Sequence, residues 1–207
     1  MSLMRSGSRT AISLGLLFLV AEGAAAQQIY DVPLEVVGDP LAHYMQETPR
    51  DPADYEELDS PIYRVTRDYN RDGRLDVAFV FTDNCGAGAY SAGCPYEFYL
   101  QLADGRFRAV GGAWLRGGEG AAIESPEPGV AHLMPCEVNQ AGEYWIASIR
   151  ISEGGLRQEP SVPIVDFDAD PRCSFQPDEQ VDYTYERCST REYLRTRTCV
   201  WRPAREE

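Results

Sequence analysis

The chain has 207 residues, 43% of them apolar, and carries 19 basic against 33 acidic residues, a formal net charge of -14. This composition is typical of a globular chain with a single domain rather than of a disordered one. Nucleic acids and anionic membrane surfaces require a basic footprint, so the charge argues against either as a primary partner. Every basic residue is arginine, and the lack of lysine excludes Schiff-base chemistry.

Residues 1–26 predict a secretory signal peptide. Two arginines precede an apolar run over 11–20, and alanines at 24–26 supply an A-x-A cleavage site. The run is about half of the roughly 20 residues that span a membrane, so a retained anchor is the weaker interpretation. We expect residues 27–207 to form one exported domain, periplasmic or secreted, without a membrane anchor.

Six cysteines lie in the expected mature chain, and an even number in an exported protein favours disulfides. The shortest loops would pair Cys85 with Cys94 and Cys188 with Cys199, which leaves Cys136 with Cys173. Other pairings remain formally open, because spacing alone does not fix connectivity. No C-x-x-C pair is present, which argues against a thiolate metal site.

The predicted elements begin with a short apolar stretch over 29–37. Asp39-Pro40 and Asp51-Pro52 then predict two helix starts, each with aspartate as N-cap and proline at the first helical position. The second helix, around 53–58, is very acidic.

Alternating patterns typical of strands follow, and glycine-rich turns separate several of them. We expect a mainly β domain with an antiparallel sheet, stabilised by disulfides. The stretches 111–129 and 158–179 are predicted to be loops, because they are rich in glycine or in proline and acidic residues. The segment 166–207 is either core or a disulfide-tied appendage. The predicted strands cover 62–66, 77–81, 97–102, 107–110, 130–135, 143–151 and 193–201.

One stretch carries recognisable chemistry, running from Asp68 to Asp76 and reading D-x-N-x-D-G-x-x-D. Oxygen side chains stand at its positions 1, 3, 5 and 9, and the glycine at position 6 allows a sharp turn. Calcium takes about six to eight oxygen ligands, so short acidic and amide side chains converging in a tight loop suit it. Position 12 is Phe79 rather than the glutamate of an EF-hand, and the flanks are strand-like, so the loop is predicted to join two strands.

This loop resembles the calcium loop of the FG-GAP repeats of integrin alpha chains and bacterial VCBS proteins. The match covers residues 62–81, and the blade-like meander of four strands that it implies would extend to 110. Those families repeat the unit around a propeller, whereas this chain has one copy, so the resemblance implies neither a propeller nor adhesion. It implies Ca²⁺ held by Asp68, Asn70, Asp72, the carbonyl of Arg74, and Asp76.

Two alternatives concern the acidic residues. Aspartate, asparagine and glycine also satisfy turns by themselves, so the loop could be a hairpin turn without metal, although four ligand positions in register exceed what a turn needs. Asp166, Asp168 and Asp170 alternate, and on a strand they would share one face that could hold a second ion or an acid/base pair. A solvated acidic loop is the preferred interpretation of this cluster.

The sequence thus favours an exported, calcium-binding, non-enzymatic interaction module with an unknown protein or glycan partner. One alternative is a periplasmic inhibitor or immunity-type protein, whose negative charge would steer a cationic enzyme toward it. The other is a hydrolase that uses the carboxylates of Asp166, Asp168 or Asp170. The two histidines, His43 and His132, are expected to be packing or surface residues.

Overall fold

The computed structural model describes residues 29–30, 32–47, 61–81, 93–115, 122–134, 136–138, 144–164 and 183–204. Four of the sequence predictions lie outside these residues: the signal peptide, the acidic helix over 53–58, the Asp166–Asp170 cluster, and any disulfide that involves Cys85 or Cys173. No helix in the described ranges is both long enough and apolar enough to cross a membrane.

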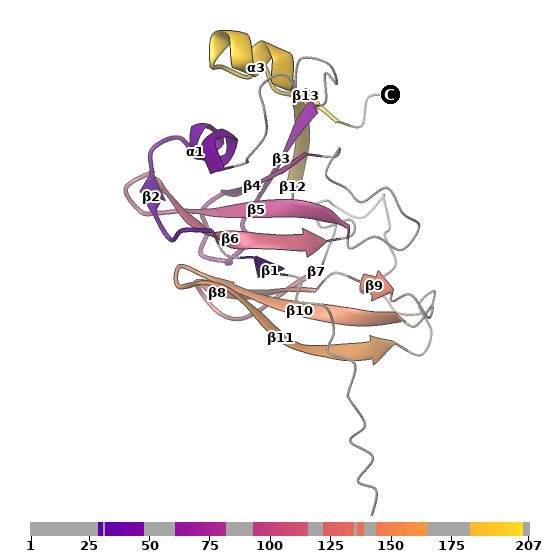
Figure 1. Ribbon diagram of the computed structural model, residues 1–207. Coiled ribbons are helices and arrows are strands. Elements are labelled where there is room, and N and C mark those ends of the chain that lie inside the picture. The colour runs from indigo at the N-terminus through magenta and orange to yellow at the C-terminus, as the bar shows by residue number, and fades with distance from the viewer. Residues whose placement is uncertain are drawn as a thin grey trace, which may run out of the picture.

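The described chain forms two antiparallel sheets that stack as layers, with the two helices beyond the outer face of the first sheet (Figure 1). The first sheet has the strand order β1-β6-β5-β4-β3-β12-β13, and β2 pairs with β6 beside β1. Its strands are β1 (Ile29–Tyr30), β2 (Val36–Val37), β3 (Pro61–Arg67), β4 (Asp76–Phe81), β5 (Cys94–Gln101), β6 (Phe107–Leu115), β12 (Tyr183–Ser189) and β13 (Arg202–Pro203).

The strands β3 to β6 are consecutive in the chain and adjacent in the sheet, which confirms the predicted antiparallel meander. In contrast, β12 comes from far along the chain and pairs with β3 at seven positions, from Tyr183↔Arg67 to Ser189↔Pro61. The described part of the C-terminal segment therefore contributes a strand to the interior of this sheet.

The second sheet has the order β11-β10-β8-β7, with β9 also pairing with β10. One of its strands lies within the predicted loop 111–129, another runs into the predicted loop 158–179 as far as Ile164, and β6 extends to Leu115, so those loop predictions were wrong in part. Its strands are β7 (Ala122–Glu127), β8 (Val130–Met134), β9 (Cys136–Val138), β10 (Tyr144–Ser152) and β11 (Gly155–Ile164).

The glycines of β6 explain why a strand forms where glycine normally signals a loop. A Cβ added to Gly112 would lie 2.0 Å from Cζ of Tyr30, and one added to Gly111 would lie 3.2 Å from Cγ of Leu156. Side chains of other strands therefore occupy the space above β6, and only glycine lets them approach this closely.

The main core lies between the two sheets. The first sheet supplies buried residues such as Val65, Phe98 and Leu100, and the second supplies Leu133, Ile149 and Ile151. A second core covers the opposite face of the first sheet. Its buried members are Leu41, Tyr44, Ile62, Val77, Phe79, Tyr99, Ala109, Cys188 and Tyr193.

The helix α1 (Pro40–Glu47) confirms the first helix prediction and its cap. Oδ1 of Asp39 accepts hydrogen bonds from the backbone N–H groups of Leu41 at 3.0 Å and Ala42 at 3.1 Å. This satisfies donors that the first helical turn leaves without partners, so the local sequence determines where α1 begins.

The strand predicted over 193–201 was wrong, because a helix, α3 (Thr190–Thr196), occupies this region. Its N-cap is Ser189, whose Oγ accepts from the N–H of Glu192 at 3.2 Å. It ends at Arg197, which has a φ of 57° and donates its N–H to the carbonyl of Tyr193 at 2.7 Å. Ser189 and Glu192 have the spacing of a capping box, a helix signal that the alternating pattern obscured.

The predicted disulfide between Cys188 and Cys199 is confirmed, with 5.6 Å between the Cα atoms. Cys94 is disulfide-bonded as well. Its predicted partner, Cys85, lies outside the described residues, so that pairing and the pairing of Cys136 with Cys173 stay predictions.

Candidate metal loop

The predicted motif forms a closed loop between β3 and β4, as expected. Arg67 and Asp76 are paired across the two strands, so they close the loop at its base. Arg71, with a φ of 57°, and Gly73, with a φ of 87°, both adopt the left-handed conformation. These two positions turn the backbone sharply, so its polar groups point toward the centre of the loop.

The carboxylate of Asp68 organises the tip of the loop. Its Oδ1 accepts the backbone N–H of Asp72 at 3.0 Å, and its Oδ2 accepts that of Gly73 at 2.9 Å. The Asp72 carboxylate in turn accepts the backbone N–H of Arg74 at 2.9 Å. The predicted ligand positions 1 and 5 are thus brought together by hydrogen bonds to the backbone.

Asp76 is fully buried at the base of the loop. Its Oδ2 accepts the N–H of Tyr69 at 2.9 Å, and its Oδ1 accepts that of Gln101, at the end of β5, at 2.8 Å. Burial disfavours the charged carboxylate and raises the pKa of Asp76 to about 7, although these backbone donors and that of Asn70 act in the opposite direction. A cation close to Asp76 would favour its ionised form.

Arg74 takes part through its side chain, which the sequence prediction did not consider. Its guanidinium forms an ion pair with the carboxylate of Asp72, and its Nε donates to the carbonyl of Gln101 at 2.7 Å. The side-chain amide of Asn70 also donates to Oδ2 of Asp72, at 2.8 Å. A positive charge and a neutral donor therefore share one oxygen of Asp72.

The loop also contacts both sheets. The carbonyl of Asn70 accepts the N–H of Gly129, in the turn between β7 and β8, at 3.0 Å. The Arg74 guanidinium lies 4.0 Å from the carboxylate of Glu153, in the turn between β10 and β11. The ring of Tyr69 is fully buried and packs edge-on against Phe98 in the main core, with centroids 5.1 Å apart. The loop is therefore a junction between the sheets.

The chemical type of the predicted ligands suits calcium, since the β3–β4 loop contains three carboxylates and one side-chain amide oxygen. In the arrangement described here, however, these oxygens bond to N–H groups. No group of three or more histidine, cysteine, aspartate or glutamate side chains in the described ranges is placed to hold a metal ion. A calcium ion at this loop would have to take the place of the Arg74 guanidinium beside Asp72.

A second buried polar network was missed by sequence reasoning. Nδ1 of His43, on α1, lies 3.0 Å from the hydroxyl of Tyr99, which donates to the carboxylate of Glu97 at 3.1 Å. All three residues are buried, and burial raises the pKa of Tyr99 above its ordinary value. This network fastens α1 to the sheet, in line with the expected packing role of His43. His132 is half-buried, and its Nδ1 lies 3.2 Å from Oγ of Ser148.

Comparisons with protein-family models, with curated proteins and with solved structures gave no match. The resemblance of the loop to FG-GAP repeats therefore stays a prediction from its motif. The alternative of a hydrolase likewise stays a hypothesis, because Asp166, Asp168 and Asp170 lie outside the described residues.

Proposed function

We propose that this chain is an exported, non-enzymatic interaction module in which a calcium ion at the β3–β4 loop stabilises the junction between the two sheets. The observation that supports the proposal is that one loop carries Asp68, Asp72 and Asp76 and also contacts a turn of the second sheet, with the carboxylate of Asp68 accepting the backbone N–H of Asp72. Burial disfavours the ionised form of the Asp76 carboxylate, and a cation in the loop would favour it.

Calcium would act here through the residues that already bind the loop together. Asp68 and Asp72 would keep their backbone hydrogen bonds and offer their remaining lone pairs. Oδ1 of Asn70, which accepts the backbone N–H of Asp72 at 3.3 Å, would do the same. The Arg74 guanidinium would leave Asp72, since it and the ion compete for the same carboxylate. The chemistry that calcium would supply is neutralisation of the carboxylate charge, which would favour the closed loop.

Thermal unfolding with calcium and with excess chelator tests this proposal. For a dissociation constant near 0.1 to 1 mM, as in extracellular calcium modules, about tenfold excess calcium adds about 1.4 kcal/mol to the free energy of unfolding. For a chain of this size the midpoint should rise by about 3 to 5 °C. An unchanged midpoint would remove the calcium site from the proposal.

Matched variants locate the ion. Asp68→Asn together with Asp72→Asn should abolish the calcium-dependent rise. Asp104→Asn removes an exposed carboxylate in the β5–β6 turn and should leave the rise intact. Arg74→Gln removes the competing cation and should increase calcium affinity about two- to fivefold, as expected for the loss of one partly exposed ion pair. Equal calcium shifts in all of these variants would place the ion elsewhere.

A further inference from the structure

His43, on α1, has two ring nitrogens in different situations. The residue is 8% exposed. Its Nδ1 lies 3.0 Å from the hydroxyl of Tyr99, on β5. Its Nε2 is also buried, but among the described residues it has no hydrogen-bond partner. A buried polar atom without a partner destabilises the folded state, so its position calls for an explanation.

The hydrogen bonds of Tyr99 determine which of these nitrogens carries a proton. The hydroxyl has one proton and donates it to the carboxylate of Glu97 at 3.1 Å. Toward His43 the hydroxyl therefore only accepts, which assigns a proton to Nδ1. A neutral imidazole has a single N–H, so Nε2 is left as a buried acceptor.

The carboxylate of Glu35, in the segment before β2, faces this acceptor. Its Oε1 lies 3.9 Å from Nε2 of His43. Neither atom carries a proton when the imidazole is neutral, so their lone pairs repel each other. The backbone of Glu35 is fixed, because its carbonyl accepts the N–H of Ala109, in β6, at 2.9 Å. Its side chain is 53% exposed, and a small rotation would bring the carboxylate to the distance of about 2.8 Å at which a charged N–H donates.

Acidic groups lie on both sides of the His43 ring. Glu35 adjoins one side directly, and Glu97 adjoins the other through Tyr99. Burial disfavours a charged imidazole, whereas the two carboxylates favour it. The core members from β4 and β6 are uncharged and include Val77, Phe79 and Ala109. The titratable groups in this core or at its edge are Tyr30 from β1, Glu35, the helix cap Asp39, Tyr44 from α1, Glu97 and Tyr99 from β5, and Tyr193 from α3.

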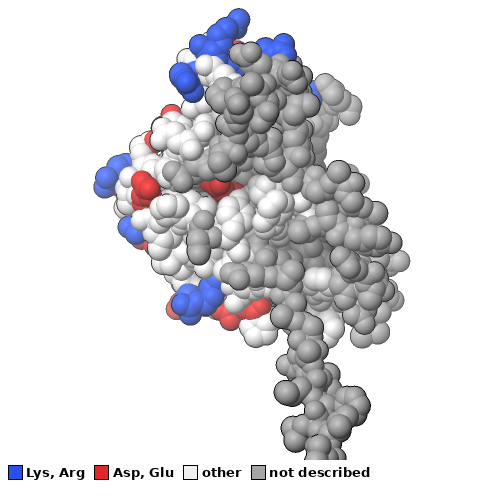
Figure 2. Space-filling model, in the orientation of Figure 1, with Lys and Arg blue, Asp and Glu red and all other residues white. Residues whose placement is uncertain are grey.

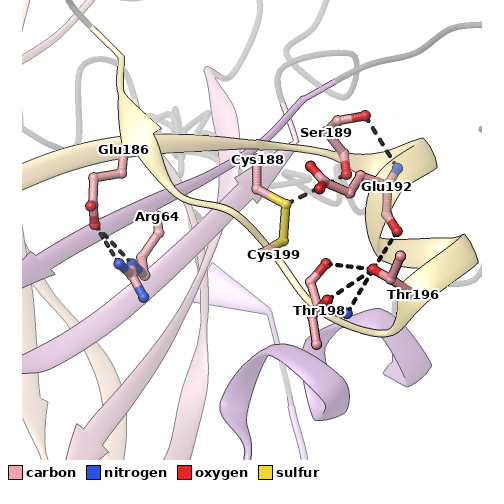
Figure 3. The surroundings of a disulfide bond; sticks show 8 residues. All are labelled: Arg64, Glu186, Cys188, Ser189, Glu192, Thr196, Thr198 and Cys199. Carbon is pink, nitrogen blue, oxygen red and sulfur yellow. Dashed lines mark hydrogen bonds and ion pairs between the residues drawn. A yellow bond between two sulfur atoms is a disulfide. The ribbon is translucent and has the colours of Figure 1, made fainter.

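Two arginines border the same core, and other groups hold them. Arg64 pairs with Glu186, as Figure 3 shows. Arg197 lies over the ring of Tyr193, 6.0 Å from its centroid. In Figure 2 the basic side chains gather at the top, where Figure 1 places α3, whereas the surface where Figure 1 places α1 is uncharged or acidic. In the described part of the chain, the imidazole of α1 is therefore the basic group placed to pair with the carboxylate before β2.

We propose that His43 is a proton-operated latch between α1 and the segment before β2. As the pH falls through the range in which histidines ordinarily ionise, about pH 8 to 5, Nε2 takes up a proton from solvent and donates it to the carboxylate of Glu35. Nδ1 keeps its bond to Tyr99, so both ring nitrogens then have partners. Because the backbone of Glu35 is bonded to β6, the latch fastens α1 to the sheet more firmly in acid. This inference goes beyond the proposed function and does not depend on calcium.

A divalent metal suits this position less well than a proton does. Zinc takes four ligands in protein sites, whereas His43 and Glu35 supply two. Because Nε2 is buried, solvent has little access to provide the others. A proton requires only the two facing atoms.

Nitrogen NMR of the imidazole rings, in chelator, tests the assignment of the proton. The chain has two histidines, so His132→Gln identifies the signals of His43. At pH 8 we expect His43 to carry its proton on Nδ1, and at pH 5 we expect protons on both nitrogens. A proton on Nε2 at pH 8 would overturn the inference, because that nitrogen would already donate to Glu35. A ring that stays neutral at pH 5 would overturn it as well.

Urea unfolding of Glu35→Gln in chelator, at pH 5 and at pH 8, tests the latch itself. Glu35 is exposed, so the variant should fold. At pH 5, where glutamates ordinarily stay ionised, it should lower the folding equilibrium constant about two- to fivefold, as expected for one partly exposed ion pair. At pH 8 it should not lower this constant, because the glutamine amide offers a donor to the neutral Nε2.

Two comparisons make the result specific. The variant is compared with the unsubstituted protein at the same pH, so the titration of Asp76, which is common to both, cancels. Asp104→Asn removes an exposed carboxylate whose pKa is held below its ordinary value by the side-chain hydrogen bond from Arg106, so it is ionised at both pH values. Its effect should therefore be equal at pH 5 and pH 8. Equal effects of Glu35→Gln at the two pH values, or the same pH dependence in Asp104→Asn, would overturn the inference.

Discussion

Removal of the disulfide between Cys188 and Cys199 should cost this protein a large part of its stability. The perturbation is the double substitution Cys188→Ala and Cys199→Ala, which avoids reduction of other bridges. The two cysteines are 11 residues apart in the sequence. For a loop of that length, the restriction of the unfolded chain contributes about 3 kcal/mol to the free energy of unfolding.

The surroundings add to this figure. Cys188 is 2% exposed in the second core, and Cys199 and Trp201 pack against the same cluster. The lost sulfur atoms leave a small void there, for which about 1 kcal/mol more is a reasonable magnitude. The expected loss is therefore about 4 kcal/mol, or a fall in the unfolding midpoint of about 8 to 16 °C for a chain of this size.

Urea unfolding followed by circular dichroism measures the loss, with the unsubstituted protein as reference. A loss below about 1 kcal/mol would refute the reasoning, since it would mean that strand pairing and packing hold this region without help from the bridge.

Three further predictions follow from local contacts. Ser189→Ala removes the N-cap of α3 and should cost about 1 kcal/mol in urea unfolding, while a neutral result would show that the disulfide alone fixes the start of the helix. Gly112→Ala forces the ring of Tyr30 aside and should cost about 1 to 3 kcal/mol, whereas Gly38→Ala, with open space around its Cβ, should be nearly neutral. In chelator, the pKa of Asp76 of about 7, above its ordinary 3.8, means that between these pH values the folded chain holds a proton that the unfolded chain has lost, so the contribution of Asp76 to stability should fall as the pH rises from 3.8 to about 7 and level off above it. Carbon NMR titration of the Asp76 carboxyl group gives its midpoint directly, and a midpoint below 3.8 would show that the backbone donors outweigh burial.

Much of the fold could be predicted because its signals are local. The strands β3 and β4 follow an alternating pattern, and the Asp39-Pro40 pair fixes the start of α1. At α3 two local signals conflicted. The residues from Tyr193 onward alternate as in a strand, but Ser189 and Glu192 carry a capping box, and the cap determines the structure.

The failures at β6 have a different cause, since no local signal could correct them. Glycine at 111 and 112 is unfavourable in a strand by itself. It is required there because Leu156 and Tyr30, both distant in the sequence, lie against the backbone. A tertiary contact thus outweighs the local preference, and one sequence does not reveal which residue will approach.

At the metal loop, too, the local sequence predicted some features and tertiary contacts determined the others. The residue types and their spacing predicted that Asp68, Asp72 and Asp76 lie in one loop between two strands, and the structure has this loop between β3 and β4. Their role as calcium ligands stays a prediction. The residue types and their spacing did not predict the side-chain role of Arg74, which was assigned only a carbonyl. Nor did they predict the bonds to Gln101 and Gly129, because those come from strand register and from the second sheet.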